Sequence, residues 1–228
     1  MALDYSKQSK LFNPANNKYG ITIFGIGSVG SHTAVALAKS GFTDIEVYDF
    51  DIVEEGNIAA QCFSLNKDIG KLKTKAIAER IYEETGIKIK IHNEKITESS
   101  VIIPTDDRIY INAVDDMKVR QLIFNKLKLV PVEYIETRIG MFILKVYCFN
   151  TGDTKKVQAY ETSFTTPTLD LKCGEKCCYP VNMNIASEIV MLCYRISTGV
   201  KRSSHLYRNL ETYEIVNDID EYELMFED

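Results

Sequence analysis

The sequence predicts an α/β fold of the Rossmann-like, doubly wound type, with a mostly parallel sheet and an antiparallel C-terminal extension. Short apolar runs alternate with longer segments whose apolar residues recur at helical spacing. A glycine-rich turn joins the first apolar run to the first helical segment. Strands that alternate with helices pair in parallel, because a parallel connection needs a long crossover.

The alternation begins near the N-terminus. Strands are expected over 21–25, 45–51, 88–96, 108–115 and 130–136, and helices over 31–41, 73–86 and 117–128. The first two helices end at Gly41 and Gly86, a common way for a helix to stop. After about Gly140 the pattern changes. There, 141–150 and 155–164 predict antiparallel strands, and 184–199 predicts one more helix.

Length and composition favour one domain. The chain has 228 residues, of which 45% are hydrophobic, enough to bury a substantial core. No Gly/Ser/Pro-rich linker and no internal repeat divides it. We therefore expect a single domain over 1–228, in which the strand–helix alternation of 1–140 does not continue into 141–228.

Charge and hydropathy exclude several classes of partner. A net charge of -5 provides no basic surface for nucleic acid. No apolar run of about 18 residues is present to span a bilayer, and the first residues lack the apolar block of a secretory signal. We therefore expect a cytoplasmic protein that binds neither nucleic acid nor membrane.

The C-terminal segment is acidic. Between Glu211 and Asp228 there are eight carboxylates and no Lys or Arg. Such a segment is usually a solvated tail, but here Tyr213, Ile215 and Val216 are among the apolar residues that interleave the charges. This pattern also suits an edge strand or a docking segment.

Residues 25–30 form a G-x-G-x-x-G turn between a predicted strand and a predicted helix. Gly25, Gly27 and Gly30 would let the backbone approach phosphates, and the unpaired N–H groups at the helix start attract negative charge. A turn needed only for packing the helix on the sheet is the alternative. Asp49 ends the second strand, where a carboxylate can accept hydrogen bonds from a ribose. These features suit NAD and ATP equally.

A second set of polar residues follows the strand ends and favours ATP. Its members are Asp51, Asn57, Gln61, Lys73 and Asp115. Because ligands bind at the carboxyl ends of parallel strands, Asp49, Asp51 and Asp115 should surround one crevice. Lys73 would reach phosphate oxygens, and Asp115 would hold Mg²⁺, which takes one or two carboxylates plus substrate phosphates. Ordinary roles remain open: a helix cap for Asp115, a solvated side chain for Lys73, a turn for Asn57.

In their order along the chain, these residues resemble the ThiF/MoeB/HesA-type adenylating enzymes, the superfamily of the ubiquitin-activating enzymes. Members show Y-[SN]-R-Q, G-x-G-x-x-G, D-x-D-x-V-x-x-x-N, R-Q, G-x-x-K, and T-D-N followed by an arginine. The matching positions here are Tyr5 to Gln8, Gly25 to Gly30, Asp49 to Asn57, Ala60-Gln61, Gly70 to Lys73, and Val114 to Asp116 with Arg120. The match is close from Tyr5 to Lys128 and loose afterwards. It makes 1–140 the nucleotide-binding half and 141–228 the half for substrate and thiol.

The resemblance implies an ATP- and Mg²⁺-dependent adenylyltransferase. Such an enzyme activates the C-terminal carboxylate of a ubiquitin-like protein or small peptide as an acyl-adenylate, with or without later transfer to a thiol. It also implies a homodimer in which the N-terminal arm completes the neighbouring site. By position, Asp49 would hold the ribose, Asn57 and Lys73 the phosphates, and Asp115 the Mg²⁺, with Gln61 lining the same pocket.

Two positions depart from the family pattern. Lys7 and Ala60 stand where members have arginines that supply guanidinium to the triphosphate. Lysine can neutralise phosphate charge but cannot form the bidentate hydrogen bonds of a guanidinium group, and alanine can do neither. Arg138, after the fifth strand, is a candidate replacement. A nucleotide-binding adaptor that no longer adenylates is therefore one alternative, and an NAD-dependent oxidoreductase is a second.

The cysteines suggest a nucleophile rather than a metal site. Cys173, Cys177 and Cys178 form C-x-x-x-C-C, whereas many relatives bind zinc through two C-x-x-C pairs, so zinc is not expected. One of these thiols is a candidate acyl acceptor, since nearby lysines favour the thiolate. An adaptable structural loop and a disulfide are the alternatives. Cys193 lies in a helical pattern and is expected to be a core thiol.

Overall fold

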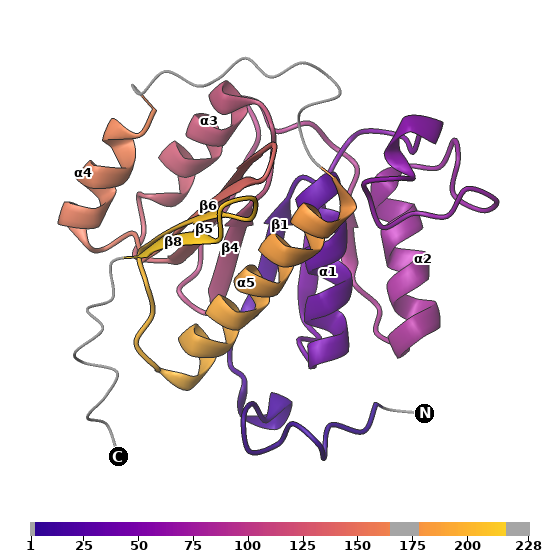
Figure 1. Cartoon of the computed structure of the whole chain (residues 1–228), viewed down its shortest axis with the longest axis horizontal. Helices are drawn as coiled ribbons and strands as arrows, with labels where there is room; N and C mark the ends of the chain where they lie inside the picture. The colour runs from indigo at the N-terminus through magenta and orange to yellow at the C-terminus, as the bar shows by residue number, and fades with distance from the viewer. Residues whose placement is uncertain (1–2, 165–177, 218–228) are drawn as a thin grey trace.

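The computed structural model describes residues 3–164 and 178–217, and it places their strands in one eight-stranded sheet (Figure 1). The strands are β1 (Gly20–Phe24), β2 (Ile45–Tyr48), β3 (Lys90–His92), β4 (Arg108–Asn112), β5 (Glu133–Gly140), β6 (Ile143–Asn150), β7 (His205–Asn209) and β8 (Glu214–Asn217). The helices are α1 (Ser28–Ser40), α2 (Lys73–Thr85), α3 (Met117–Leu127), α4 (Thr154–Thr162) and α5 (Tyr179–Thr198), with 3-10 turns η1 (Pro14–Asn16) and η2 (Glu55–Asn57).

The sheet has the predicted topology. Its strand order is β3-β2-β1-β4-β5-β6-β7-β8. The first five strands pair in parallel, and β6, β7 and β8 extend the sheet by antiparallel pairing. The strand order reverses between β1 and β4, so their carboxyl ends flank the crevice in which open α/β sheets bind ligands. The prediction of a mostly parallel sheet with an antiparallel C-terminal extension is confirmed.

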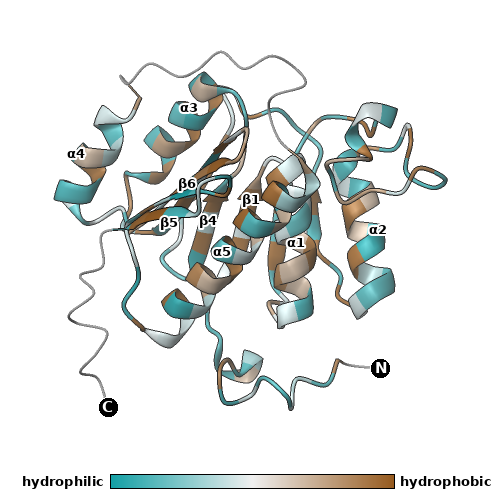
Figure 2. Cartoon of the chain, viewed as in Figure 1, coloured by the Kyte–Doolittle hydropathy of each residue, from teal (hydrophilic) through white to brown (hydrophobic). Residues whose placement is uncertain are grey.

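Helices cover both faces of the sheet, and each face has its own core (Figures 1 and 2). Alternate strand residues face opposite sides. Ile109 and Ile111 join the core under α1, α2 and α5, whereas Tyr110 joins Phe124 and Tyr160 in the core under α3 and α4. Figure 2 shows the central strands β1 and β4 in the hydrophobic colour and much of α4 in the hydrophilic colour. The central strands β1 and β4 are therefore buried between the two cores.

The prediction of a strand over 155–164 is wrong, because this segment contains helix α4. The Asp153 side chain caps the helix by accepting a hydrogen bond from the Lys156 backbone N–H at 3.2 Å. Tyr160 is the buried residue of this helix and packs edge-on against Phe124. Val157 and Tyr160, three residues apart, both pack on the core under α3 and α4, as residues on one side of a helix do, and the local cap favours the helix start.

The acidic segment begins as an edge strand, as one of its interpretations predicted. β8 pairs with β7 at the end of the sheet, and its side chains are exposed. Residues 218–228 lie outside the described part of the chain. Across residues 3–164 and 178–217, every helix is too short or too polar to cross a bilayer.

Candidate functional site

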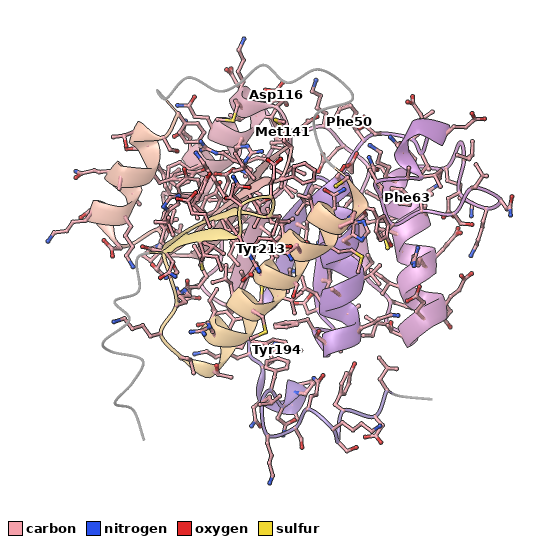
Figure 3. The ribbon with its side chains drawn as sticks, viewed as in Figure 1. Phe50, Phe63, Asp116, Met141, Tyr194 and Tyr213 are labelled. Carbon is pink, nitrogen blue, oxygen red and sulfur yellow. The ribbon has the colours of Figure 1, made fainter. Side chains whose placement is uncertain are left out.

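A cleft of about 640 Å³ lies at the carboxyl ends of the parallel strands. Its lining includes Gly25, Gly27, Ser28, Asp49, Phe50, Asp51, Gln61, Lys73, Asp115, Asp116, Arg120, Thr137 and Arg138. Figure 3 labels two of these residues, Phe50 and Asp116, at the end of the molecule opposite Tyr194. The structure therefore brings Asp49, Asp51 and Asp115 to one crevice, as the strand-end argument predicted.

The glycine turn combines tight packing with an open position. A Cβ atom on Gly30 would lie 1.9 Å from the Gly25 carbonyl oxygen, and one on Gly25, whose φ is +88°, would lie 2.9 Å from the Ala113 oxygen. By contrast, a Cβ on Gly27 would meet no heavy atom within 4 Å. Gly27 also precedes α1 as its N-cap and provides no side-chain cap. The turn thus leaves space beside the start of a helix, where the N–H groups and the dipole favour an anion.

Asp49 holds this turn in place. Its Oδ2 accepts a hydrogen bond from the Ile26 N–H at 2.6 Å, and its Oδ1 accepts one from the Asp51 N–H at 2.8 Å. Each carboxylate oxygen has two lone pairs, so one acceptor position on each remains for a ligand hydroxyl. Asp49 can therefore shape the glycine turn and still contact a ribose.

Lys73 and Asp51 form a cation–anion pair at the cleft. Lys73 is the first residue of α2, its Nζ lies 2.9 Å from Asp51 Oδ2, and its backbone N–H donates to the Asp51 carbonyl at 2.9 Å. The Lys73 side chain is 8% exposed and that of Asp51 is 48% exposed. The lysine stem is therefore fixed by burial while the carboxylate stays hydrated, so the ammonium is directed into the cleft.

Asp116, not Asp115, caps helix α3. The Asp116 Oδ1 accepts hydrogen bonds from the Lys118 and Val119 N–H groups at 2.8 and 3.2 Å. This geometry rules out the capping role considered for Asp115. Among the described residues, Asp115 has no hydrogen-bond or salt-bridge partner. Its carboxylate is therefore available to a ligand in the cleft.

The donor set fits Mg²⁺ bound together with a phosphate ligand. In the described ranges, His, Cys, Asp and Glu form no group of three able to hold a metal ion. Mg²⁺ needs only one or two carboxylates when phosphates and water complete its shell. Asp115 at the rim, with Lys73 and the open space at Gly27, meets that requirement.

Asn57 and Lys7 are among the predicted residues that lie outside the cleft lining, as Gly30 and Cys178 also do. Asn57 closes a capping box at η2, where its Oδ1 accepts a hydrogen bond from the Glu54 N–H at 3.0 Å. Lys7 lies on an N-terminal turn that is held at the far end of α1, where the Gln8 side chain donates to the Ser40 carbonyl at 2.9 Å. Within one chain, Lys7 is therefore remote from the glycine turn.

Ala60, at one of the two positions that depart from the family pattern, has a structural role through its backbone. Its carbonyl accepts hydrogen bonds from His32 Nε2 at 3.1 Å and from Asn182 Nδ2 at 2.8 Å. Because a carbonyl only accepts, His32 must carry its proton on Nε2. Burial lowers the pKa of His32 below its ordinary value. These contacts join α1 and α5 to the segment that places Gln61 in the cleft.

A buried charge cluster under the cleft was missed by sequence reasoning. Glu136, in β5, is 0% exposed and pairs with the guanidinium groups of Arg120 and Arg138. Arg120 is itself 5% exposed, and burial lowers its pKa to about 10, so it stays protonated at neutral pH. The available signal was Glu136, one of two acidic residues in the predicted strand 130–136.

Arg138 lines the cleft but is engaged by its own chain. Its Nε lies 3.1 Å from Glu136 Oε2, and its Nη2 donates to Ser163 Oγ at 2.8 Å. The Tyr147, Tyr160 and Phe164 rings surround its guanidinium at 5.0, 5.9 and 5.3 Å from their centroids. Because its guanidinium group is already bound, Arg138 is less available to replace the arginine absent at position 60 than its sequence position predicts.

The described cysteines fall into two environments. Cys62, Cys148 and Cys193 are buried thiols, which confirms the core role expected for Cys193. Burial raises the pKa of Cys148 to about 12, so it is a poor nucleophile. Cys178 is exposed and is the N-cap of α5. Cys173 and Cys177 lie outside the described residues.

Comparison with known proteins identifies the family but covers only part of each relative. The NEDD8-activating enzyme E1 catalytic subunit of Arabidopsis thaliana is 31% identical over 104 residues, which span 45% of this chain and 23% of that protein. The tRNA threonylcarbamoyladenosine dehydratase of Haemophilus influenzae is 32% identical over 111 residues, which span 44% of this chain and 40% of that protein. This chain therefore matches less than half the length of either relative.

The fold is shared with a solved enzyme structure. The crystal structure of E. coli MccB has a TM-score of 0.72 at 16% identity, covering 90% of this chain and 63% of MccB. At this identity the likeness is one of fold. The ThiF family matches residues 6–225, nearly the whole sequence. The chain therefore belongs to the ThiF family.

Proposed function

We propose that this chain is an ATP-dependent adenylyltransferase that activates the C-terminal carboxylate of a ubiquitin-like protein or a small precursor peptide. The observation that carries the proposal is the free carboxylate of Asp115, which shares one cleft with the Lys73–Asp51 pair and the open position at Gly27. A cation, a metal-binding carboxylate and a phosphate-accepting turn in one crevice suit a nucleoside triphosphate.

In the proposed reaction, a carboxylate oxygen of the substrate attacks the α-phosphorus of ATP. The bond from that phosphorus to the bridging oxygen breaks, and the products are an acyl-adenylate and pyrophosphate. Lys73 and the start of α1 would bind the phosphates, Asp49 the ribose, and Asp115 the Mg²⁺, which neutralises phosphate charge. Such catalysis depends on positioning and charge neutralisation. Gln61 would line the nucleotide pocket, and Asn57 would act by fixing η2.

The names of the relatives support the substrate class. One is a NEDD8-activating enzyme subunit, and the solved structures of MccB include complexes with ATP and with MccA. Another relative is a tRNA threonylcarbamoyladenosine dehydratase, so the family covers several reactions. We propose a protein or peptide C-terminus here, in a cytoplasmic homodimer in which Lys7 would serve the neighbouring site. We propose separately that a later reaction step transfers the acyl group to Cys173, Cys177 or Cys178.

An adaptor that binds nucleotide without adenylating is the second candidate. Ala60 and Lys7 favour it, because neither supplies the guanidinium that family members use at these positions. An NAD-dependent oxidoreductase is disfavoured, because hydride transfer makes no use of the Lys73–Asp51 pair or of Asp115.

Pyrophosphate exchange tests the proposal. Candidate peptides with free C-termini are incubated with the protein, MgATP and labelled pyrophosphate. Label in ATP that depends on a free peptide carboxylate, and that is lost with a C-terminally amidated peptide, supports adenylation. The peptides tested include those encoded near the protein's own gene. If the protein binds ATP in a Mg²⁺-dependent way but none of these peptides supports pyrophosphate exchange, the result would favour the adaptor.

A further inference from the structure

The cleft rests on a buried carboxylate that has two guanidinium partners. Glu136 and Arg138 are two residues apart on β5 and share a face of the strand, and Arg120 reaches the same carboxylate from α3. A buried carboxylate is stable only when it is paired and hydrogen-bonded. Each of the three charges therefore constrains the positions of the other two.

Arg120 connects this carboxylate to the chain beside Asp115. Its Nη1 donates to the Thr137 carbonyl at 2.5 Å, and its Nη2 donates to the Val114 carbonyl. Val114 immediately precedes Asp115, and on the other side Asp116 is fixed as the cap of α3. Asp115 thus lies between two anchored backbone positions, one of which depends on the orientation of Arg120.

We propose that Glu136 is a positioning residue for Asp115. Its charge holds the Arg120 fork, the fork fixes the Val114 carbonyl, and this carbonyl sets the direction in which Asp115 presents its carboxylate. Groups that orient a metal-binding residue influence metal affinity strongly even though they never touch the metal. The inference rests on the proposed function, because it assigns Asp115 to the Mg²⁺ of a bound nucleotide.

The same carboxylate links the cleft to α4. The Nε of Arg138 donates a hydrogen bond to Glu136. Its Nη1 and Nη2 donate to the carbonyl and the hydroxyl of Ser163, just past the end of α4. Glu136 therefore holds in place two guanidinium groups that line the cleft. In this arrangement Arg138 orders the wall of the cleft, and Glu136 determines where that wall lies.

A structural ion pair with no role in the site is the competing interpretation, and Mg²⁺ dependence separates the two. ATP binding is measured by calorimetry with Mg²⁺ and again with EDTA, and the ratio of the two dissociation constants is the Mg²⁺ enhancement. Two variants are compared with the wild type. Glu136→Gln removes the carboxylate charge and Arg120→Lys removes the guanidinium fork, and both keep approximately the size of the side chain. Glu46→Gln is the matched control, since Glu46 is also ion-paired within the sheet but does not line the cleft.

Mispositioning of Asp115 should reduce the Mg²⁺ enhancement by about tenfold or more in Glu136→Gln and Arg120→Lys. Affinity in EDTA should stay within about twofold of wild type, and Glu46→Gln should behave as wild type. A folded Glu136→Gln protein with the full enhancement would overturn the inference and leave the proposed function standing. Equal losses with and without Mg²⁺, or unfolding of both variants, would reduce Glu136 to a structural role. Absence of ATP binding by the wild type would overturn the proposed function itself.

Discussion

The Nζ atom of Lys73 lies 2.9 Å from Oδ2 of Asp51, at the first turn of α2 and beside the cleft. Lys73→Met should lower MgATP affinity by about tenfold to a hundredfold, since a hydrogen bond to a charged group is worth roughly 1.5–3 kcal/mol. The fold should persist, because Asp51 is 48% exposed and stays hydrated without its partner. Calorimetric titration with MgATP measures the loss.

Lys71→Met is the matched control for this prediction. Lys71 lies two residues away and pairs with the exposed Glu79 at 2.5 Å, outside the cleft lining. Its removal should change MgATP affinity by less than about twofold, since exposed pairs contribute little. Equal losses in the two variants would mean that Lys73 acts only through general surface charge.

The glycine turn predicts opposite outcomes for two neighbouring substitutions. Gly30→Ala should lower the free energy of unfolding by about 1–3 kcal/mol or more, because its Cβ would lie 1.9 Å from the Gly25 oxygen. Gly27→Ala should cost less than about 1 kcal/mol, because its Cβ meets nothing within 4 Å. It should nevertheless weaken ATP binding, since the added methyl takes up ligand space. Denaturant unfolding and calorimetry together test the pair, and a stable Gly27→Ala protein with unchanged ATP affinity would remove Gly27 from the site.

His32 predicts a dependence of stability on acid pH. Burial lowers its pKa in the folded protein below the ordinary value of 6.5. Below pH 6.5 the unfolded chain therefore binds the proton more readily, and folding stability is lost as the pH falls toward the folded-state pKa. This contribution is fully present above pH 6.5. His32→Gln should flatten the curve of unfolding free energy between pH 7 and pH 5, and parallel curves for wild type and variant would contradict it.

The strand-end residues were predictable because a general rule places them. The carboxyl ends of parallel strands meet at one edge, so Asp49, Asp51 and Asp115 could be assigned to one crevice from sequence alone. The choice between Asp115 and its neighbour Asp116 as the helix cap could not be made, because it depends on the dihedral angles of one turn. The sequence also left open whether Asn57 faces a ligand or closes η2.

The parts that sequence reasoning missed depend on contacts between distant segments. The pairing of Arg120 with Glu136 follows from how α3 lies across β5, which no local pattern encodes. Residues 155–164 were predicted to form a strand, whereas the cap at Asp153 and the packing of Tyr160 stabilise helix α4 there. The likeness to ThiF-type enzymes supplied roles for residues, but only the structure showed that Arg138 is already engaged.

The cysteine cluster predicts at most one acyl acceptor. If a thioester forms, one of the three substitutions Cys173→Ala, Cys177→Ala and Cys178→Ala should remove an adduct that thiol reagents release. Cys193→Ala serves as the control, because burial raises the pKa of this thiol well above its ordinary value. Mass spectrometry of the intact protein after incubation with MgATP and a substrate peptide follows the adduct. An adduct that survives all three substitutions would exclude transfer to this cluster.

The central claim is that Asp115 binds the Mg²⁺ of a bound ATP, and calorimetry on one variant tests it most directly. ATP, with and without Mg²⁺, and NAD are titrated into the wild type and into Asp115→Ala. We expect ATP binding that Mg²⁺ strengthens in the wild type, loss of that strengthening in Asp115→Ala, and an unchanged melting temperature. Retention of the full Mg²⁺ effect by the variant, or binding of NAD in place of ATP by the wild type, would contradict the claim.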